Sequence, residues 1–346
     1  MADHPLLTQL LDGKVAALAR AVSIVENGRD GFEALLASIH PRLGHARRIG
    51  ITGPPGAGKS TLTERLVSSY RASGLRVAVV AVDPTSPFTG GALLGDRIRM
   101  EQIALDPGVY IRSMATRGSL GGLATATREV CDLLDAAGFD RILVETVGVG
   151  QSELDVARMA DSTILVLVPE SGDGIQALKS GVMEVADCFL VNKADRPGAE
   201  KVRREIELAL DLRLGTAHRN LPAHHGGAKQ RPSAVIAKGH PTDDGWRAPV
   251  LLGVAATGEG TGELLAELDR HWNWMVSSGE LERRRRERLA QRTREVVDRA
   301  TRRWVWQESH AEEAITTRLD DVTAGQLSPY ELAAEIVASL KEGARV

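Results

Sequence analysis

The residues best suited to do chemistry lie in one short glycine-rich segment early in the chain. It fits the pattern G-x-x-x-x-G-K-[ST] and comprises Gly53, Pro54, Pro55, Gly56, Ala57, Gly58, Lys59 and Ser60, with Thr61 next. Glycines let backbone N–H groups turn toward phosphate oxygens, and the start of the following helix adds its positive dipole end. We expect Lys59 to reach the β- and γ-phosphates of a nucleotide and Ser60 to ligate Mg²⁺.

A second segment, Asn192-Lys193-Ala194-Asp195, has the N-K-x-D arrangement that GTPases use to read guanine. The Asp195 carboxylate can accept hydrogen bonds from N1–H and the 2-amino group of guanine, a donor pair that adenine lacks. Adenine would leave this carboxylate unpaired, which is costly. We expect Asn192 and Lys193 to brace the loop and cover the ring, so the predicted ligand is GTP or GDP.

Small residues follow the last expected strand, in the run Val254-Ala255-Ala256-Thr257-Gly258. GTPases present a small residue and a backbone N–H to guanine O6 at the corresponding place. We therefore expect Ala255, Ala256 and Thr257 to lie beside the base.

Three carboxylates are expected at the rim of the same site. The strand Arg141–Glu145 leads into Glu145-Thr146-Val147-Gly148, where common GTPases have D-x-x-G, with the acid near Mg²⁺ and the glycine N–H at the γ-phosphate. Glu145 is longer than Asp but keeps the hard oxygen ligand that Mg²⁺ prefers. Asp83 ends another strand and Asp96 lies in a glycine-rich loop. The carboxyl ends of strands collect ligands in α/β folds, although a turn-capping role is the alternative for Asp83 and Asp96.

The hydrolytic machinery predicts a slow enzyme that depends on a partner. Ras-like GTPases place a water-orienting Gln directly after the D-x-x-G glycine, and Val149 holds that position here. Gln151 lies two residues further on and would substitute only after a loop movement. We expect Lys59, Glu145 and Gln151 to act in catalysis. Candidates for an arginine finger, each of which is also explained as a solvated surface residue, are Arg97, Arg99 and Arg117.

Alternating strand and helix patterns supply the scaffold for these segments. Several of the expected strands are apolar throughout, as strands buried on both faces must be. Helical patterns such as Ser60–Ser73 and Gly122–Ala137 lie between them. The predicted fold is α/β, a P-loop NTPase with a mainly parallel, doubly wound sheet. The expected strands are Arg48–Thr52, Val77–Val82, Val109–Arg112, Arg141–Glu145, Thr163–Val168, Cys188–Val191 and Val250–Val254.

Helical extensions are expected on both sides of this core. Apolar residues recur at helical spacing from Leu6 onward, and a further helical run covers Phe32 to Ile39. From Trp272 to Glu313 the chain is charged and helical in period, and a capping box followed by Pro opens a last helix at Ser328. The predicted division is an N-terminal helical extension (1–44), a G domain (45–275) and a C-terminal helical dimerisation arm (276–346).

Composition narrows the class of protein. A net charge of −3 gives no overall basic excess for nucleic acid or acidic lipid, and no apolar run is long enough to span a bilayer. Cys131 and Cys188 lie far apart and are expected to be buried thiols in a reducing compartment. The first residues lack a signal-peptide pattern. We therefore expect a cytoplasmic protein without a membrane or nucleic-acid partner.

Taken in order, these motifs resemble the accessory GTPases of adenosylcobalamin-dependent acyl-CoA mutases. This is the MeaB family, whose relatives also carry the label ArgK. The resemblance covers most of the chain, and its most telling segments are Asp83-Pro84-Thr85-Ser86-Pro87 and Glu145-Thr146-Val147-Gly148-Val149-Gly150-Gln151, which ordinary GTPases lack.

The resemblance implies a function and several site roles. It implies a chaperone that gates cofactor loading into a mutase such as methylmalonyl-CoA mutase and protects or reactivates it. It also implies a homodimer through the C-terminal arm and a switch over Gly172–Asp187 that the mutase reads, with Lys179 at the interface. The implied Mg²⁺ contacts come from Ser60, Asp83, Asp96 and Glu145.

Other interpretations stay open at this point. A metal-centre maturation GTPase usually carries a His- or Cys-rich stretch, and the long loop Gly215–Pro249 has only scattered histidines and no cysteine. A transport-associated kinase needs an acceptor pocket and a base, and neither has a recognisable signature. A structural dimer with a vestigial phosphate loop is opposed by the intact Lys59-Ser60 pair.

Overall fold

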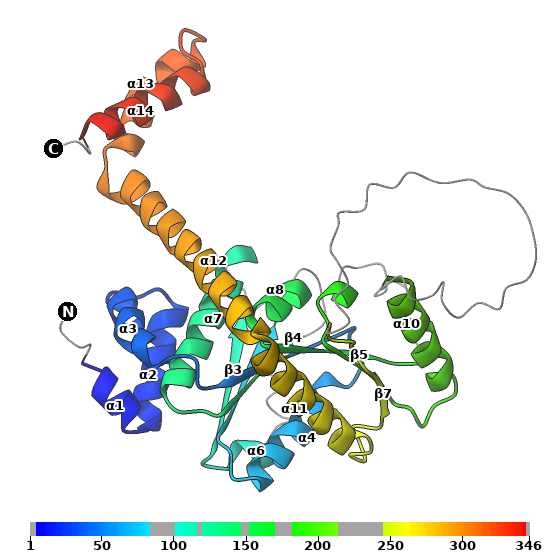
Figure 1. Ribbon diagram of the computed structural model, residues 1–346. Coiled ribbons are helices and arrows are strands. Elements are labelled where there is room, and N and C mark those ends of the chain that lie inside the picture. The colour runs from blue at the N-terminus through cyan, green and yellow to red at the C-terminus, as the bar shows by residue number, and fades with distance from the viewer. Residues whose placement is uncertain are drawn as a thin grey trace, which may run out of the picture. The chain divides into compact units, whose positions relative to one another are not determined.

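The computed structural model describes residues 5–83, 101–115, 120–146, 152–169, 182–213 and 245–343. The chain divides into two compact units, Met1–Leu281 and Glu282–Val346. The first unit contains the sheet, and the described residues of the second are helical (Figure 1). The finer division at residues 44 and 275 stays a prediction.

Seven strands of the first unit form one sheet in the order β3-β2-β4-β1-β5-β6-β7. Every neighbouring pair runs parallel. This doubly wound parallel sheet confirms the predicted fold class, and all seven expected strands are present with small shifts at their ends. The bounds are β1 (Arg47–Thr52), β2 (Val77–Asp83), β3 (Val109–Ala115), β4 (Arg141–Thr146), β5 (Ser162–Leu167), β6 (Cys188–Asn192) and β7 (Val250–Gly253).

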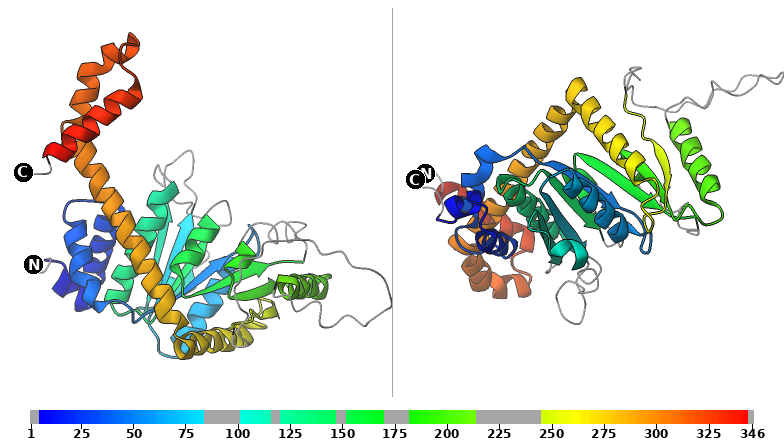
Figure 2. Two further views of the ribbon diagram at one scale, coloured as in Figure 1. Left: turned by 45° about the horizontal axis from the view of Figure 1, so that its top comes forward. Right: turned by 90° about the horizontal axis from the view of Figure 1, so that it is seen from below.

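Helices cover both faces of the sheet (Figures 1 and 2). One face packs against α4 (Lys59–Ala72), α6 (Glu101–Ala104) and α11 (Thr261–Ser278), and the other against α7 (Leu120–Ala136), α8 (Ser152–Met159) and α10 (Ala199–Arg213). Alternate side chains of a strand point to opposite faces. In β5, Ile164 and Val166 accordingly join the core with α4 and α11, whereas Leu165 and Leu167 join the core with α10.

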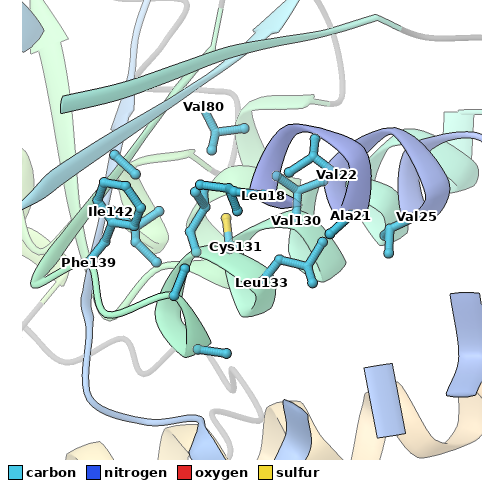
Figure 3. Packing of buried hydrophobic residues seen from close by; sticks show 14 of the residues in the cluster. Leu18, Ala21, Val22, Val25, Val80, Val130, Cys131, Leu133, Phe139 and Ile142 are labelled. Atoms are coloured by element: carbon cyan, nitrogen blue, oxygen red, sulfur yellow. The ribbon is translucent and has the colours of Figure 1, made fainter. Parts of the chain in front are cut away.

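The N-terminal helices α1 (Leu7–Leu11), α2 (Val15–Glu26) and α3 (Phe32–Ile39) share the core of the first unit. Leu18 and Val22 of α2 lie against Val130 and Leu133 of α7 (Figure 3). The helical run from Leu6 is interrupted at Gly13, whose φ of 73° is in the left-handed region that glycine tolerates. The described residues of this unit also include the short 3₁₀ turns η1 (His40–Arg42) and η2 (Val182–Glu184).

A buried carboxylate ties the N-terminal helices to β1. Asp135, near the end of α7, accepts hydrogen bonds from the backbone N–H groups of Gly44, His45 and Ala46, at 2.8, 3.1 and 2.9 Å. The guanidinium of Arg48 lies 3.5 Å from the same carboxylate. These donors satisfy a charge that would otherwise be expensive to bury, so Asp135 fixes the chain as it enters the central strand.

Both cysteines are buried thiols, as predicted, and neither forms a disulfide. Cys131 lies within the core between α7 and α2 (Figure 3). Burial raises the pKa of the Cys131 thiol from 9.0 to about 11, and burial also raises the pKa of Cys188. Ionisation is disfavoured because the thiolate would lose its hydration.

The second unit contains most of α12 (Glu280–Arg303), then a π-helical turn, η4 (Trp304–Glu308), α13 (Ala311–Thr323) and α14 (Pro329–Gly343). The helical period over Trp272–Glu313 corresponds to several helices, because Gly279 ends α11 with a φ of 76° and a second break precedes α13. The capping box is confirmed. The Ser328 N–H donates to Glu331 Oε2 at 2.8 Å, and the Glu331 N–H donates to Ser328 Oγ at 3.2 Å.

The second unit has little core of its own. Among its described residues, the only buried apolar side chains are those of Ala311 and Leu332. Larger apolar side chains are exposed, so the helices present an apolar surface that they do not bury among themselves. The exposed set is Leu289, Val296, Val297, Trp304, Trp306, Leu319, Tyr330 and Val337. None of the helices in the described ranges is long and apolar enough to cross a bilayer.

Candidate functional site

The sheet register brings the predicted site residues to one edge. Thr52 ends β1 and leads directly into Gly53, and the preceding residue, Ile51, pairs with Glu145 of β4. On its other side Thr52 pairs with Leu165 of β5. Since the order of strands reverses at β1, Glu145 and the phosphate loop meet at the point where α/β folds bind ligands.

Two glycines of the phosphate loop are required by close packing. Gly53 has a φ of 139°, and a Cβ there would lie 2.1 Å from the carbonyl oxygen of Val166. Gly58 has a φ of 89°, and a Cβ there would lie 2.3 Å from Nδ2 of Asn192. Both positions combine a backbone conformation that L-residues disfavour with a contact that leaves no room for a side chain. The loop is therefore held tightly against β5 and β6.

Lys59 places a buried positive charge beside the first residues of the phosphate loop. It is the first residue of α4 and is only 6% exposed. Its ammonium donates hydrogen bonds to the carbonyl oxygens of Gly53 at 2.8 Å and Pro54 at 3.0 Å. The charge lies where the positive end of the α4 dipole also acts, so phosphate is favoured at this point.

The Glu145 carboxylate is held by two hydroxyl groups of α4. Ser60 Oγ donates to Oε1 at 2.6 Å, and Thr63 Oγ1 donates to Oε2 at 2.7 Å. Glu145 is 3% exposed and Thr63 is fully buried. Hydrogen bonds to an ionised, buried acceptor are short and strong, so these contacts fix the carboxylate beside the first turn of α4.

Asn192 links the phosphate loop to the segment after β7. Its Nδ2 donates to the carbonyl oxygen of Ala57 at 2.7 Å, and its Oδ1 accepts the N–H of Ala255 at 2.9 Å. Lys193 donates to the carbonyl oxygen of Gly56 at 2.8 Å and has a φ of 57°, in the left-handed region. These contacts join Asn192 and Lys193 to the phosphate loop, and their role at the base stays a prediction.

The segments expected around the base lie next to each other. Asn192 at the end of β6 pairs with Gly253 at the end of β7, so Asp195 and the turn at 254–258 follow neighbouring strands. Asp195 and Ala256 are exposed. Arg65 of α4 donates from Nε to the Ala255 carbonyl oxygen at 3.1 Å and from Nη2 to the Ala256 carbonyl oxygen at 2.5 Å.

Comparison with known proteins identifies the class to which this arrangement belongs. The family described as "Methylmalonyl Co-A mutase-associated GTPase MeaB" matches residues 18–310. The chain belongs to the MeaB family. A putative GTPase of Pyrococcus horikoshii is 45% identical over 292 residues, which cover 84% of each chain. This MeaB-family protein is therefore a GTPase.

Two further relatives bear on what this MeaB-family GTPase does. A mouse protein named "Methylmalonic aciduria type A homolog, mitochondrial" is 35% identical over 297 residues, covering 81% of this chain and 65% of the mouse protein. A solved structure titled "Crystal structure of LAO/AO transport system kinase" matches with a TM-score of 0.63 and 27% identity. That match covers 97% of this chain and 96% of the other.

The described structure brings most of the predicted site residues of this MeaB-family chain together. Residues 53–61, Glu145, Asn192, Lys193, Asp195 and 255–257 lie at the carboxyl edge of the sheet. Asp83 ends β2, but its side chain is outside the description. Also outside the described residues are Asp96, Arg97, Arg99, Arg117, Gly148, Val149, Gln151, Lys179 and 214–244.

Sequence reasoning missed two residues of the site. Thr63 follows Ser60 by three positions, so both hydroxyls lie on the same side of α4, and this spacing is the signal that could have found it. Arg65 had no such signal, because its partners are backbone atoms of a turn about 190 residues later in the sequence.

Proposed function

We propose that this GTPase is a nucleotide-dependent chaperone of an adenosylcobalamin-dependent acyl-CoA mutase such as methylmalonyl-CoA mutase. The observation that carries the proposal is the match of residues 18–310 to a family described as mutase-associated. The mouse relative, whose name refers to methylmalonic aciduria, supports the same assignment. In this function GTP binding and hydrolysis control when cofactor enters the mutase and when damaged cofactor leaves.

The phosphate side of the site supports a role for Mg²⁺. Ser60 and Glu145 offer a hydroxyl and a carboxylate, both hard oxygen donors, and their oxygens lie 2.6 Å apart. We assign Ser60 as a ligand of Mg²⁺ and Glu145 as a carboxylate that holds the metal. Asp83 and Asp96 are the further expected acids. Bound Mg²⁺ would neutralise charge on the β- and γ-phosphates. Lys59 supplies the positive charge that the protein itself contributes.

The base side supports guanine. Asp195 follows β6 and is exposed, so its carboxylate is accessible to a ligand. We assign its carboxylate to N1–H and the 2-amino group of guanine. We assign the Ala256 N–H to guanine O6, because the neighbouring Ala255 N–H is already used by Asn192.

The second unit supports a homodimer. Its exposed tryptophans, Trp304 and Trp306, belong to an apolar surface that the described part of the unit leaves uncovered. Burial of such a surface against a second copy would remove it from water, which is favourable in proportion to the area buried.

The mutase assignment is tested with purified proteins. The steady-state GTPase rate of the full chain is measured with and without the host's mutase loaded with adenosylcobalamin, and a pull-down compares GDP with a non-hydrolysable GTP analogue. We expect a faster rate with mutase and binding that depends on the nucleotide, because the two equilibria are reciprocally linked. Lys59→Ala is the control that removes hydrolysis by this protein. An unchanged rate together with absent or nucleotide-independent binding would contradict the proposal.

A further inference from the structure

One arginine connects the helix of the phosphate loop to the turn beside the base. Arg65 lies in α4, five residues after Ser60. Its guanidinium donates to two consecutive carbonyl oxygens, from Nε to Ala255 and from Nη2 to Ala256. Two donors of one planar group thus bind two successive peptide units, and the rigid guanidinium fixes the spacing and direction of both hydrogen bonds.

The first of these peptide units contains the donor assigned to guanine. The carbonyl of Ala255 and the N–H of Ala256 belong to the same planar peptide group, and in a trans peptide they point in opposite directions. Holding the Ala255 oxygen toward α4 therefore directs the Ala256 N–H away from α4. Within the described residues this N–H donates to no protein acceptor.

The other N–H groups of the turn are already used. The Ala255 N–H donates to Asn192 Oδ1 at 2.9 Å, and the N–H groups of Thr257 and Gly258 donate to the Val254 carbonyl oxygen at 3.0 and 2.9 Å. The Ala256 N–H is thus the one donor of residues 255–258 left for a ligand. A positive charge on the carbonyl of the same peptide also polarises that N–H, which makes it a better donor.

We propose that Arg65 is a positioning residue for guanine recognition, which aims the Ala256 N–H at guanine O6. The proposal rests on the assignment of the base to the Asp195 loop and the 254–258 turn given above. Arg65 acts through the peptide unit and does not itself touch the nucleotide base. It extends the function of α4 from the phosphates to the base.

Nucleotide analogues that differ at single positions of the base test the proposal. Affinities of the full chain are measured by calorimetry for GDP, for 6-thio-GDP, which replaces O6 by a poorer acceptor, and for IDP, which keeps O6 but lacks the 2-amino group. In Arg65→Ala we expect GDP and IDP each to bind about three- to tenfold more weakly, the range for one neutral hydrogen bond. We expect 6-thio-GDP to change little, so the preference for GDP over 6-thio-GDP shrinks.

Two controls on the same helix and one in the base loop separate the alternatives. Arg65→Lys keeps the charge but loses the fixed planar geometry of the two donors, and we expect it to lose most of the preference as well. Arg71→Ala removes another arginine of α4 that bonds the Leu75 carbonyl and Asp106, and it should leave the three affinities unchanged. Asp195→Asn tests the base assignment itself, because it should reduce the preference for GDP over IDP.

The outcomes are distinct. If Asp195→Asn leaves the preference for GDP over IDP intact, the base assignment fails, and the Arg65 proposal fails with it. If Asp195→Asn behaves as expected but Arg65→Ala weakens all three nucleotides equally, Arg65 contributes only charge or general stability, and the positioning role is overturned. A wild-type protein that does not distinguish GDP from 6-thio-GDP would also overturn it.

Discussion

Thr63→Val removes one hydroxyl from the site without changing the shape of the side chain. Thr63 is fully buried, and its hydroxyl donates to Glu145 Oε2 at 2.7 Å while lying 3.0 Å from the Lys59 carbonyl oxygen. Valine keeps the volume and the β-branch but cannot donate. Glu145 then keeps Ser60 as its partner and loses the second support.

The magnitude follows from the kind of contact that is lost. A hydrogen bond to a buried, ionised acceptor contributes about 1.5–3 kcal/mol, so the free energy of unfolding should fall by that amount. The freed carboxylate also regains rotamers that metal binding must restrict again. For one Glu side chain this costs about 1 kcal/mol, which corresponds to a roughly fivefold higher Mg²⁺ concentration for half-maximal GTPase activity.

The assay has a matched control in the same fold. Thr127 of α7 is also fully buried, and its hydroxyl has no hydrogen-bond partner within the described structure. Thr127→Val should therefore leave the Mg²⁺ requirement unchanged and leave stability unchanged or slightly increased. Urea unfolding without nucleotide and Mg²⁺ titration of GTP hydrolysis are measured for both variants.

The two variants can refute the reasoning. Equal destabilisation of Thr63→Val and Thr127→Val would mean that the loss comes from helix packing and not from the carboxylate contact. A Thr63→Val protein with the wild-type Mg²⁺ requirement would show that Glu145 needs no second hydroxyl to act at the metal.

Four other outcomes are expected. Asp195→Asn should weaken GTP binding by roughly 2–4 kcal/mol and admit xanthine nucleotides, as measured by calorimetry; a wild type that binds ATP and GTP equally would contradict the assignment. Asp135→Asn should lower the free energy of unfolding by about 2–3 kcal/mol, because three backbone donors lose their charged acceptor; an unchanged urea midpoint would show that these contacts are not stabilising. Deletion of residues 281–346 should leave a monomer that binds GTP, and a full-length chain that sediments as a monomer at micromolar concentration would exclude the dimer. The raised pKa of Cys131 means that the folded state holds the neutral thiol while the thiol of the unfolded state ionises at lower pH. The contribution of this thiol to the free energy of unfolding is therefore fully present below pH 9 and is lost between pH 9 and about 11. Alkylation of Cys131 at pH 8 should occur only as fast as the protein unfolds, and rapid labelling of the native protein would contradict the burial.

The parts of the fold that could be predicted are those specified by local pattern. The seven strands are short apolar runs, and Gly53–Ser60 and Asn192–Asp195 are motifs whose chemistry is contained in consecutive residues. Arg65 escaped prediction because its role depends on the meeting of α4 with a turn far away in sequence, which no local pattern records. The break at Gly279 was not predicted because a charged, helix-favouring run follows it directly, and one glycine within a helical pattern is often tolerated.

The strand order has a consequence for how the protein is made. β1 lies between β4 and β5, so the strand that carries the phosphate loop has no neighbours until Arg141–Leu167 has been synthesised. The hydrogen bonds of Asn192 and Arg65 to Ala255 cannot form until the turn after β7 has been synthesised. Domains fold as units during translation, and pairing between distant segments comes late. A nascent chain that stops before β7 would carry the full phosphate-loop motif but lack the base site. Tight GTP binding therefore distinguishes a completed first unit from a fragment still emerging from the ribosome.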